Sequence, residues 1–216
     1  MSMASPRNRD TRENILDGCL KMFLQKNYGQ VTGEDIVFFS GYTKRTIYQY
    51  FKGKNDLFIA VTDRFIQKLM NYLERFNSEP RNSLLDYILG YIGYAKNLSL
   101  YIKAMTDNKV SSHLSFMVQA SMYYDGFEGK IKELFDLEQK GWEDNLRMAM
   151  EKQEIRENID IPLTAAKFRS MSTGIDFHTM MVPHAVSVNA LQLLMIDLYN
   201  DIKMSPVATA NILDLL

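Results

Sequence analysis

The chain has 216 residues, and 46% of them are hydrophobic, which is enough for a packed core and argues against a disordered protein. Only 5 prolines and 11 glycines occur, so the composition favours long helices over a turn-rich β fold. The formal net charge of −1 neither indicates nor excludes a nucleic-acid partner.

The charge is distributed unevenly along the chain. Residues 1–56 carry nine Lys/Arg and six Asp/Glu, whereas the remainder carries 16 and 20, so a basic N-terminal end precedes an acidic remainder. This asymmetry is typical of a DNA-binding head on a regulatory domain. We therefore predict two domains, with a DNA-binding head at 1–55 and a larger domain at 56–216.

The cysteine content indicates a reducing compartment. Cys19 is the single cysteine, so no internal disulfide can form, and its place on an apolar helix face predicts a buried side chain. The first ten residues contain no apolar run of the kind a secretory signal needs. The long weakly charged stretch 171–196 is interrupted by Asp176, Pro183 and His184, so we expect no membrane span and a cytoplasmic location.

Hydrophobic periodicity predicts an all-α chain. After a solvated arm at 1–9, apolar residues at helical spacing predict a first helix at about Asp10–Lys26. The Asn-Ser-Glu-Pro-Arg-Asn run at 77–82 ends the long helix predicted at 54–76. The remaining predicted helices lie at 83–97, 98–107, 111–124, 126–156, 163–181 and 187–203.

The stretch 31–58 reads as two short helices with a tight turn between them. Gly41 provides the positive φ that such a turn requires, and Thr43 can cap the following helix, Lys44–Tyr50. Thr32 is the predicted N-cap of the preceding helix, Gly33–Ser40. Ile47 and Phe51 point inward, so the outward face carries the cations, hydroxyls and amide that reach phosphates and base edges.

Residues 11–58 resemble the TetR family of bacterial transcriptional regulators. The resemblance is carried by the ordered segments TGEDIV (32–37), SGYT (40–43) and TIYQYFKGKNDL (46–57), about the first quarter of the chain. The sequence departs from the family pattern at Gly33, Ser40 and Tyr42, where the family prefers an apolar residue, an alanine and a small β-branched residue. Beyond residue 58 only the number and length of the predicted helices match.

The resemblance implies that Lys44–Tyr50 is a recognition helix lying in the major groove of double-stranded DNA, with a dimer bound to a pseudo-palindromic operator. Phosphate contacts are carried over to five positions: Thr32, Thr43, Tyr48, Tyr50 and Lys54. The candidates for base edges are Lys44, Arg45, Thr46 and Gln49. By its donor pattern Arg45 suits guanine, and the amide of Gln49 suits adenine.

The resemblance also implies a small-molecule effector bound between the middle helices. Aromatic residues and methionines with a few hydroxyls form the walls of amphipathic ligand pockets. Plain core packing remains the alternative at each position. The candidate residues for this site are Tyr91, Tyr94, Met105, Phe116, Tyr123, Trp142 and Phe177.

The last two helices are the predicted dimer interface. Their apolar residues extend beyond one stripe, which indicates a second partner surface such as a two-fold four-helix bundle, whereas packing within the chain is the alternative. The candidate interface residues are Met171, Ile175, Leu191, Leu194, Met195 and Leu198.

These features bear on three classes of function. A ligand-responsive dimeric repressor fits best, with the helix at 54–76 as the lever between head and body. An all-helical ligand-binding or protein-interaction module that no longer reads DNA is the alternative, because Gly33 and Tyr42 depart from the family pattern. An enzyme is not expected, because no catalytic or phosphate-binding motif occurs and His113, His178 and His184 lack clustered metal-ligand partners, so we predict no metal and no cofactor.

Overall fold

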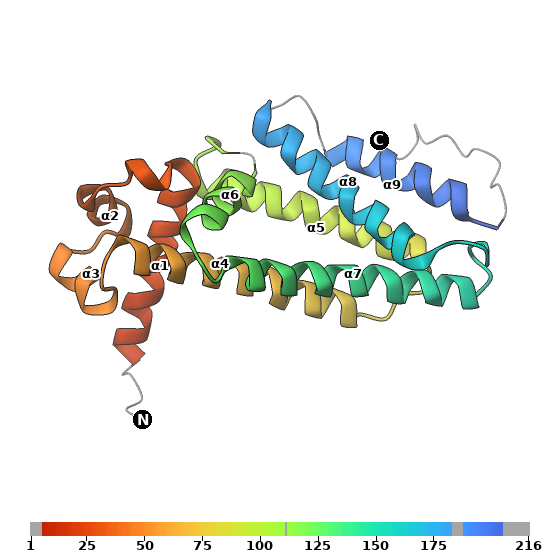
Figure 1. The fold of residues 1–216 in the computed structure, drawn as a ribbon, viewed down its shortest axis with the longest axis horizontal. Helices are drawn as coiled ribbons and strands as arrows, with labels where there is room; N and C mark the ends of the chain where they lie inside the picture. Colours follow the sequence, from red (N-terminus) through yellow and green to blue (C-terminus); the bar gives the residue numbers. More distant parts are fainter. Residues whose placement is uncertain (1–5, 111, 183–187, 205–216) are drawn as a thin grey trace. The chain divides into compact units, whose positions relative to one another are not determined.

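The computed structural model describes residues 6–110, 112–182 and 188–204, and over these ranges the chain is built from α-helices (Figure 1). Nine α-helices and one short 3-10 helix lie in the described ranges, together with an isolated bridge between Ile155 and Lys203. The predicted all-α fold class is therefore confirmed.

The chain forms two compact units. The head unit comprises Met1–Asn71 and Ile102–Glu133, and the body unit comprises Tyr72–Tyr101 and Leu134–Leu216. Three helices pass from one unit into the other, namely α4 (Lys54–Ser78), α5 (Leu84–Met105) and α7 (Phe127–Glu151). The connection between the units is therefore not limited to α4. The domain boundary predicted at residue 55 is placed differently, because the head unit also contains α6 and parts of these three helices.

The head unit is organised around α1 (Pro6–Gln25). The apolar face of this helix is buried, as is the predicted Cys19 on it: Ile15, Leu16, Cys19, Leu20, Phe23 and Leu24. Beside it lie the 3-10 helix Tyr28–Gln30, then α2 (Gly33–Ser40), α3 (Lys44–Tyr50), the first part of α4, and α6 (Leu114–Tyr123) (Figure 1). The rings of Phe58 on α4 and Phe116 on α6 meet edge to face at 5.7 Å, so α6 completes the core of the head.

The body unit contains α8 (Ile161–Met181) and α9 (Val188–Ile202), which lie side by side, with parts of α4, α5 and α7 (Figure 1). Its core joins aromatic and aliphatic side chains from all five helices, and Trp142 within it is fully buried. Asp160 caps α8 by accepting a hydrogen bond from the N–H of Leu163, and Pro162 lies in the first turn, where proline costs no hydrogen bond.

Three predicted boundaries are corrected. The two helices expected at 83–97 and 98–107 are one helix, α5, because no glycine or proline interrupts the chain between Lys96 and Leu100. The first helix begins at Pro6, so 6–9 of the predicted arm are helical, whereas 1–5 lie outside the described residues. Helix α7 ends at Glu151, and Gln153 with φ of 58° turns the chain there.

No helix within the described ranges has the length and apolar character that a membrane crossing requires.

Candidate nucleic-acid interface

The turn between α2 and α3 has the geometry that its residues predict. Gly41 ends α2 with φ of 73°, and its N–H donates to the carbonyl of Val37 at 3.0 Å. The Thr43 hydroxyl then caps α3 by accepting from the N–H of Thr46 at 3.2 Å. Both predicted roles are confirmed, and together they fix the direction in which α3 leaves the turn.

A capping box holds the start of α2. The Thr32 hydroxyl accepts from the N–H of Asp35 at 3.2 Å, and the Asp35 carboxylate accepts from the N–H of Thr32 at 3.0 Å. Lys26 forms an ion pair with the same carboxylate. The ammonium group of Lys26 and the backbone of Thr32 lower the pKa of Asp35 to about 2. The carboxylate is therefore charged at any physiological pH and fastens α2 to the end of α1.

A close approach of two backbones positions α2 on α1. A Cβ atom built on Gly18 would lie 2.2 Å from the carbonyl oxygen of Phe39 and 2.9 Å from the Cα of Ser40. Only glycine fits at this contact, because backbone atoms cannot turn aside as a side chain can. Gly18 therefore sets how closely α2, and with it α3, packs on α1.

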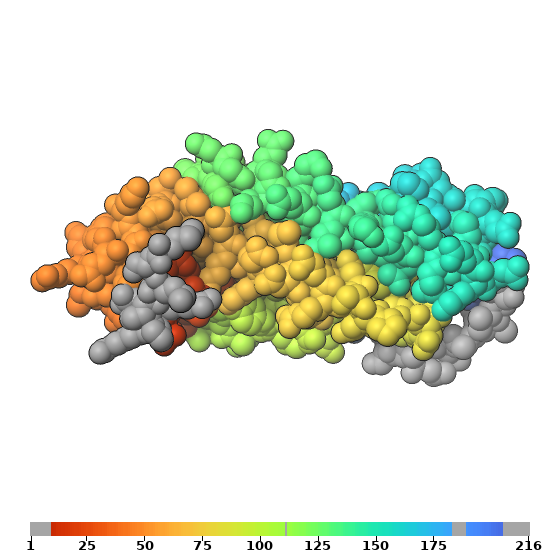
Figure 2. Space-filling view, turned by 90° about the horizontal axis from the view of Figure 1, so that it is seen from below, coloured from red at the N-terminus to blue at the C-terminus, as the bar shows by residue number. Residues whose placement is uncertain are grey.

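Helix α3 exposes one polar face. Ile47 and Phe51 are buried and anchor the helix, as predicted. The side chains of Lys44, Arg45, Tyr48 and Gln49 are exposed, Tyr48 by 49%, and this segment lies in the part of the head surface drawn in orange in Figure 2. Thr46 and Tyr50 are partly buried, and the Thr46 hydroxyl is hydrogen-bonded to that of Thr43 at 3.0 Å. Four predicted DNA contacts thus share one accessible face.

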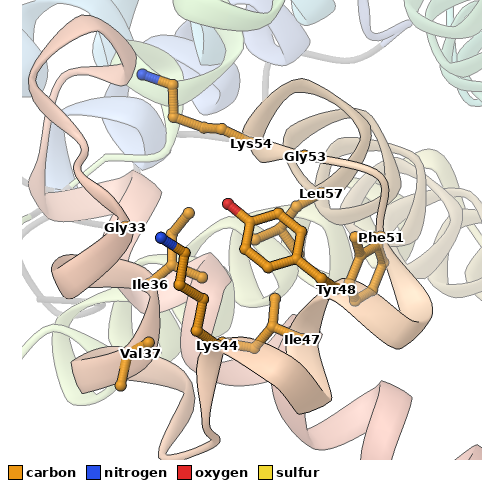
Figure 3. A pocket seen from close by; sticks show the side chains of 10 residues that line it. All are labelled: Gly33, Ile36, Val37, Lys44, Ile47, Tyr48, Phe51, Gly53, Lys54 and Leu57. Atoms are coloured by element: carbon orange, nitrogen blue, oxygen red, sulfur yellow. The ribbon is translucent and has the colours of Figure 1, made fainter.

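A shallow pocket lies between α2, α3 and the start of α4 (Figure 3). Its floor is apolar, whereas the ends of Lys44, Tyr48 and Lys54 are directed toward one side of it. No atom lies within 4 Å of the position that a Cβ on Gly33 would occupy, so the departure from the family pattern at Gly33 leaves open space at the start of α2. An ammonium group and a phenol beside a helix N-terminus form a suitable environment for a phosphate.

The ammonium group of Lys54 already has hydrogen-bond partners within the head unit. It donates to the carbonyls of Tyr28 at 3.0 Å and Val31 at 3.1 Å, and it lies 4.4 Å from the centre of the Tyr28 ring. We therefore treat Lys54 as a residue that positions the start of α4. The Thr32 hydroxyl is similarly committed, because it donates to the Asp35 carboxylate at 3.0 Å.

Contacts between residues far apart in the sequence hold α6 and the α5–α6 turn within the head unit. The N–H of Tyr28 donates to the side-chain oxygen of Gln119, and the rings of Tyr28 and Tyr123 stack at 4.3 Å. Lys21 on α1 forms an ion pair with Asp107 at 2.8 Å. No local sequence pattern predicts these contacts, because each one joins residues about 80 or more positions apart.

The predicted effector residues fall into different environments. In the body unit, Tyr91 is buried, Trp142 lies 4.9 Å from its ring, and Tyr94 lies 6.0 Å from it. Phe177 is 50% exposed and does not belong to that cluster. In the head unit, Phe116 is a core residue, Tyr123 stacks on Tyr28, and Met105 is partly buried. Three of the seven residues are therefore brought together.

The predicted dimer residues divide between core and surface. Leu191 is 1% exposed and Met195 is fully buried, so the prediction is wrong for these two side chains, which fill the core of the body unit. Leu194 is 44% exposed. The side chains of Met171, Ile175 and Leu198 are partly buried against the core. Helix α9 carries one apolar stripe that is buried and another that is exposed, and the sequence pattern alone does not separate the two.

Within the described residues, no group of three or more His, Cys, Asp or Glu side chains is arranged to hold a metal ion.

Comparison with known proteins identifies the head. Residues 15–61 match the model of bacterial regulatory proteins of the tetR family. No curated protein matches the chain. Solved structures that resemble it include SmeT in complex with triclosan, at 22% identity over 94% of this chain and 97% of that one, with a TM-score of 0.70.

Two further structures share the fold. A TetR-family regulator from Cytophaga hutchinsonii is 17% identical over 95% of this chain and 100% of its own, with a TM-score of 0.72. A regulator from Saccharomonospora viridis in complex with choline is 15% identical over 91% of this chain and 100% of its own, with a TM-score of 0.72. Residues 15–61 therefore carry the N-terminal DNA-binding segment of bacterial regulatory proteins of the tetR family, and the chain shares the fold of these solved regulators.

Proposed function

We propose that the protein is a dimeric transcriptional repressor that binds a pseudo-palindromic operator and is released from it by a small molecule. The observation that carries this proposal is the exposed face of α3, where Lys44, Arg45, Tyr48 and Gln49 lie together on a helix anchored by Ile47. A dimer carries two such helices, and adjacent major-groove half-sites are roughly 34 Å apart.

Each exposed side chain has a role that follows from its chemistry. Arg45 donates two hydrogen bonds to guanine, and Gln49 pairs with adenine. Tyr48 and Lys44 flank the shallow pocket beside the start of α2 and hold a phosphate there. The hydroxyls of Thr43 and Thr32 cap their helices. The backbone N–H groups beside them therefore face the DNA phosphates more than the hydroxyls do.

An exposed stripe on α8 and α9 supports dimerisation. Gly174, Phe177 and Met181 recur at helical spacing on α8 and are exposed, Phe177 by 50% and Met181 by 61%. Leu193 and Leu194 on α9 are 42% and 44% exposed. A second copy of the chain covers this apolar surface in the proposed dimer, and the missing side chain of Gly174 allows its helix to approach closely.

Replacing Phe177 with lysine is expected to weaken the dimer about 30-fold or more, because truncating a central aromatic interface residue costs about 2 kcal/mol or more and the lysine must also be desolvated. Analytical ultracentrifugation over a concentration series measures the change. Operator affinity should fall together with dimer affinity, since each protomer then binds its half-site on its own.

The matched control for this variant is Leu89→Lys. Leu89 is 43% exposed on α5 and does not belong to the two helices, α8 and α9, that carry the proposed interface, so the same cationic substitution should leave dimerisation unchanged. Equal dimer affinity in wild type and Phe177→Lys would remove this stripe from the interface.

Release by a small molecule is supported by what related folds bind. SmeT, the repressor of the Stenotrophomonas maltophilia multidrug efflux pump SmeDEF, has been solved with triclosan, and the Saccharomonospora viridis regulator with choline. In this chain α4, α5 and α7 each connect the body unit to the head unit. An effector that binds one body conformation more tightly shifts the population of head arrangements, with a coupling of about 1–3 kcal/mol that acts equally on effector and DNA affinity.

A further inference from the structure

Three helices of the body unit bring their aromatic faces to one carboxylate. Glu138 and Trp142 lie one turn apart on α7, and Tyr91 and Tyr94 lie three residues apart on α5. The hydroxyl of Tyr91 donates to the Glu138 carboxylate. The ring of Trp142 is 4.9 Å from that of Tyr91, and it stacks on Phe168 of α8 at 4.6 Å with only 3° between the ring planes.

The outer side of this cluster is also aromatic. Tyr72 stacks on Tyr94 at 4.5 Å with 19° between the planes. Met150 and Met171 are partly buried and pack against the same core. Methionine side chains are flexible and adapt to a new neighbour, so the cluster has a border that can rearrange around a ligand.

The charge balance in the cluster is negative. Burial is the largest influence on Glu138 and raises its pKa above the usual value, although the hydrogen bond from Tyr91 and the positive Arg169 lower it, and Asp176 raises it further. Two carboxylates thus act against one guanidinium group. That guanidinium group donates to the carbonyl of Phe135 at 3.4 Å and lies over the Phe135 ring at 5.5 Å. The direct donor to Glu138 is a neutral phenol, so no cationic side chain forms an ion pair with this carboxylate within the described residues.

The negative charge of Glu138 also acts on its surroundings. Burial is the first cause and Glu138 the second cause that raise the pKa of Tyr87, Tyr91 and Tyr94. All three phenols therefore stay neutral, and Tyr91, whose ring faces are electron-rich, contacts the carboxylate directly through its hydroxyl.

Two polar atoms of α7 beside Glu138 are buried without a hydrogen-bond partner in the described part of the chain. They are the indole Nε1 of Trp142, whose side chain is fully buried, and the side-chain oxygen of Gln139. Buried polar groups are nearly always satisfied in folded proteins, so an unsatisfied pair next to a charged side chain marks a place where a further molecule can bind.

We propose that this cluster of Tyr91, Tyr94, Glu138, Trp142 and Phe168 binds the effector and selects hydrophobic organic cations. A cation with an apolar substituent replaces the phenol as the partner of Glu138 and places its positive charge against the aromatic faces, which attract cations. This inference rests on the proposed function, because it names the chemical class of the small molecule that releases the repressor from the operator.

The only tryptophan of the chain, Trp142, reports on the cluster directly. Titrating full-length protein with phenyltrimethylammonium should change the Trp142 emission saturably. Its uncharged isostere tert-butylbenzene should bind at least ten-fold more weakly. Glu138→Gln should weaken phenyltrimethylammonium at least ten-fold and leave tert-butylbenzene unchanged, because only the charge is removed.

Glu151→Gln is the matched control, since it removes an exposed carboxylate from the end of the same helix and should change neither affinity. Equal binding of the two ligands by the wild type, or equal binding of the cation by wild type and Glu138→Gln, overturns the proposal. If Glu138→Gln lacks the helical circular dichroism of the wild type, the comparison of the two ligands on the wild type decides.

Operator affinity measured in the same samples separates this proposal from the proposed function. Release by phenyltrimethylammonium but not by tert-butylbenzene supports both. Release by the uncharged ligand alone overturns the cation site and leaves a ligand-responsive repressor. Saturable Trp142 binding of the cation with unchanged operator affinity supports the site and contradicts the proposed release.

Discussion

Replacing both Arg45 and Tyr48 with alanine should lower operator affinity at least about 100-fold. A bidentate contact from arginine to guanine discriminates by about 1–3 kcal/mol, and a hydrogen bond to a charged phosphate is worth about 1.5–3 kcal/mol. Both side chains are exposed, so their removal should not change thermal unfolding. Fluorescence anisotropy with operator DNA measures the affinity, and circular dichroism checks the fold.

Arg147→Ala provides the control for charge. Arg147 is exposed on α7 and pairs with Glu143 and Asp144 on its own helix, so its loss removes one cation without touching α3. It should leave operator affinity within about two-fold, because surface ion pairs contribute little. Wild-type affinity in the Arg45 and Tyr48 double variant would show that α3 does not read DNA.

Gly18→Ala is expected to destabilise the head by about 3 kcal/mol, the upper end of the usual cost of overpacking. The new methyl group would collide with the backbone of Phe39 and Ser40, which can give way only if α2 moves away from α1. Because α3 follows α2 directly, operator affinity should fall as well. Urea unfolding followed by circular dichroism measures the loss of stability.

Gly33→Ala is the matched control for this substitution. Its Cβ would meet no atom within 4 Å, and its helical position gains from alanine, so stability should rise by about 0.5–1 kcal/mol. If Gly18→Ala and Gly33→Ala changed stability alike, the close approach of α1 and α2 would not position the helix-turn-helix.

The head could be predicted because its signals are local. Thr32, Gly41 and Thr43 form helix caps with residues at most four positions away, and Gly41 also supplies a positive φ. Their roles can therefore be predicted from the sequence. The bounds of α2 and α3 were predicted correctly for the same reason. Lys54 shows the limit, because its partners are backbone carbonyls more than 20 residues away.

The body could be predicted as helical, but the roles of its side chains could not. An aromatic residue at helical spacing fills a core or lines a site with the same pattern, and Phe116 proved to be core. Leu191 and Met195 are buried in the chain's own core, because α9 has one apolar stripe toward α8 and another toward solvent. Glu138 was missed because a single carboxylate on a helix carries no signal until Tyr91 is brought to it.

The most direct test of the central claim is the affinity of the wild-type protein for the DNA immediately upstream of its own gene, compared with a scrambled duplex of equal length across a salt series. We predict at least about 1,000-fold tighter binding to the upstream DNA, with both affinities falling as salt rises and phosphate contacts are lost. Equal affinity for the two duplexes at every salt concentration would contradict the assignment of this chain as an operator-reading repressor.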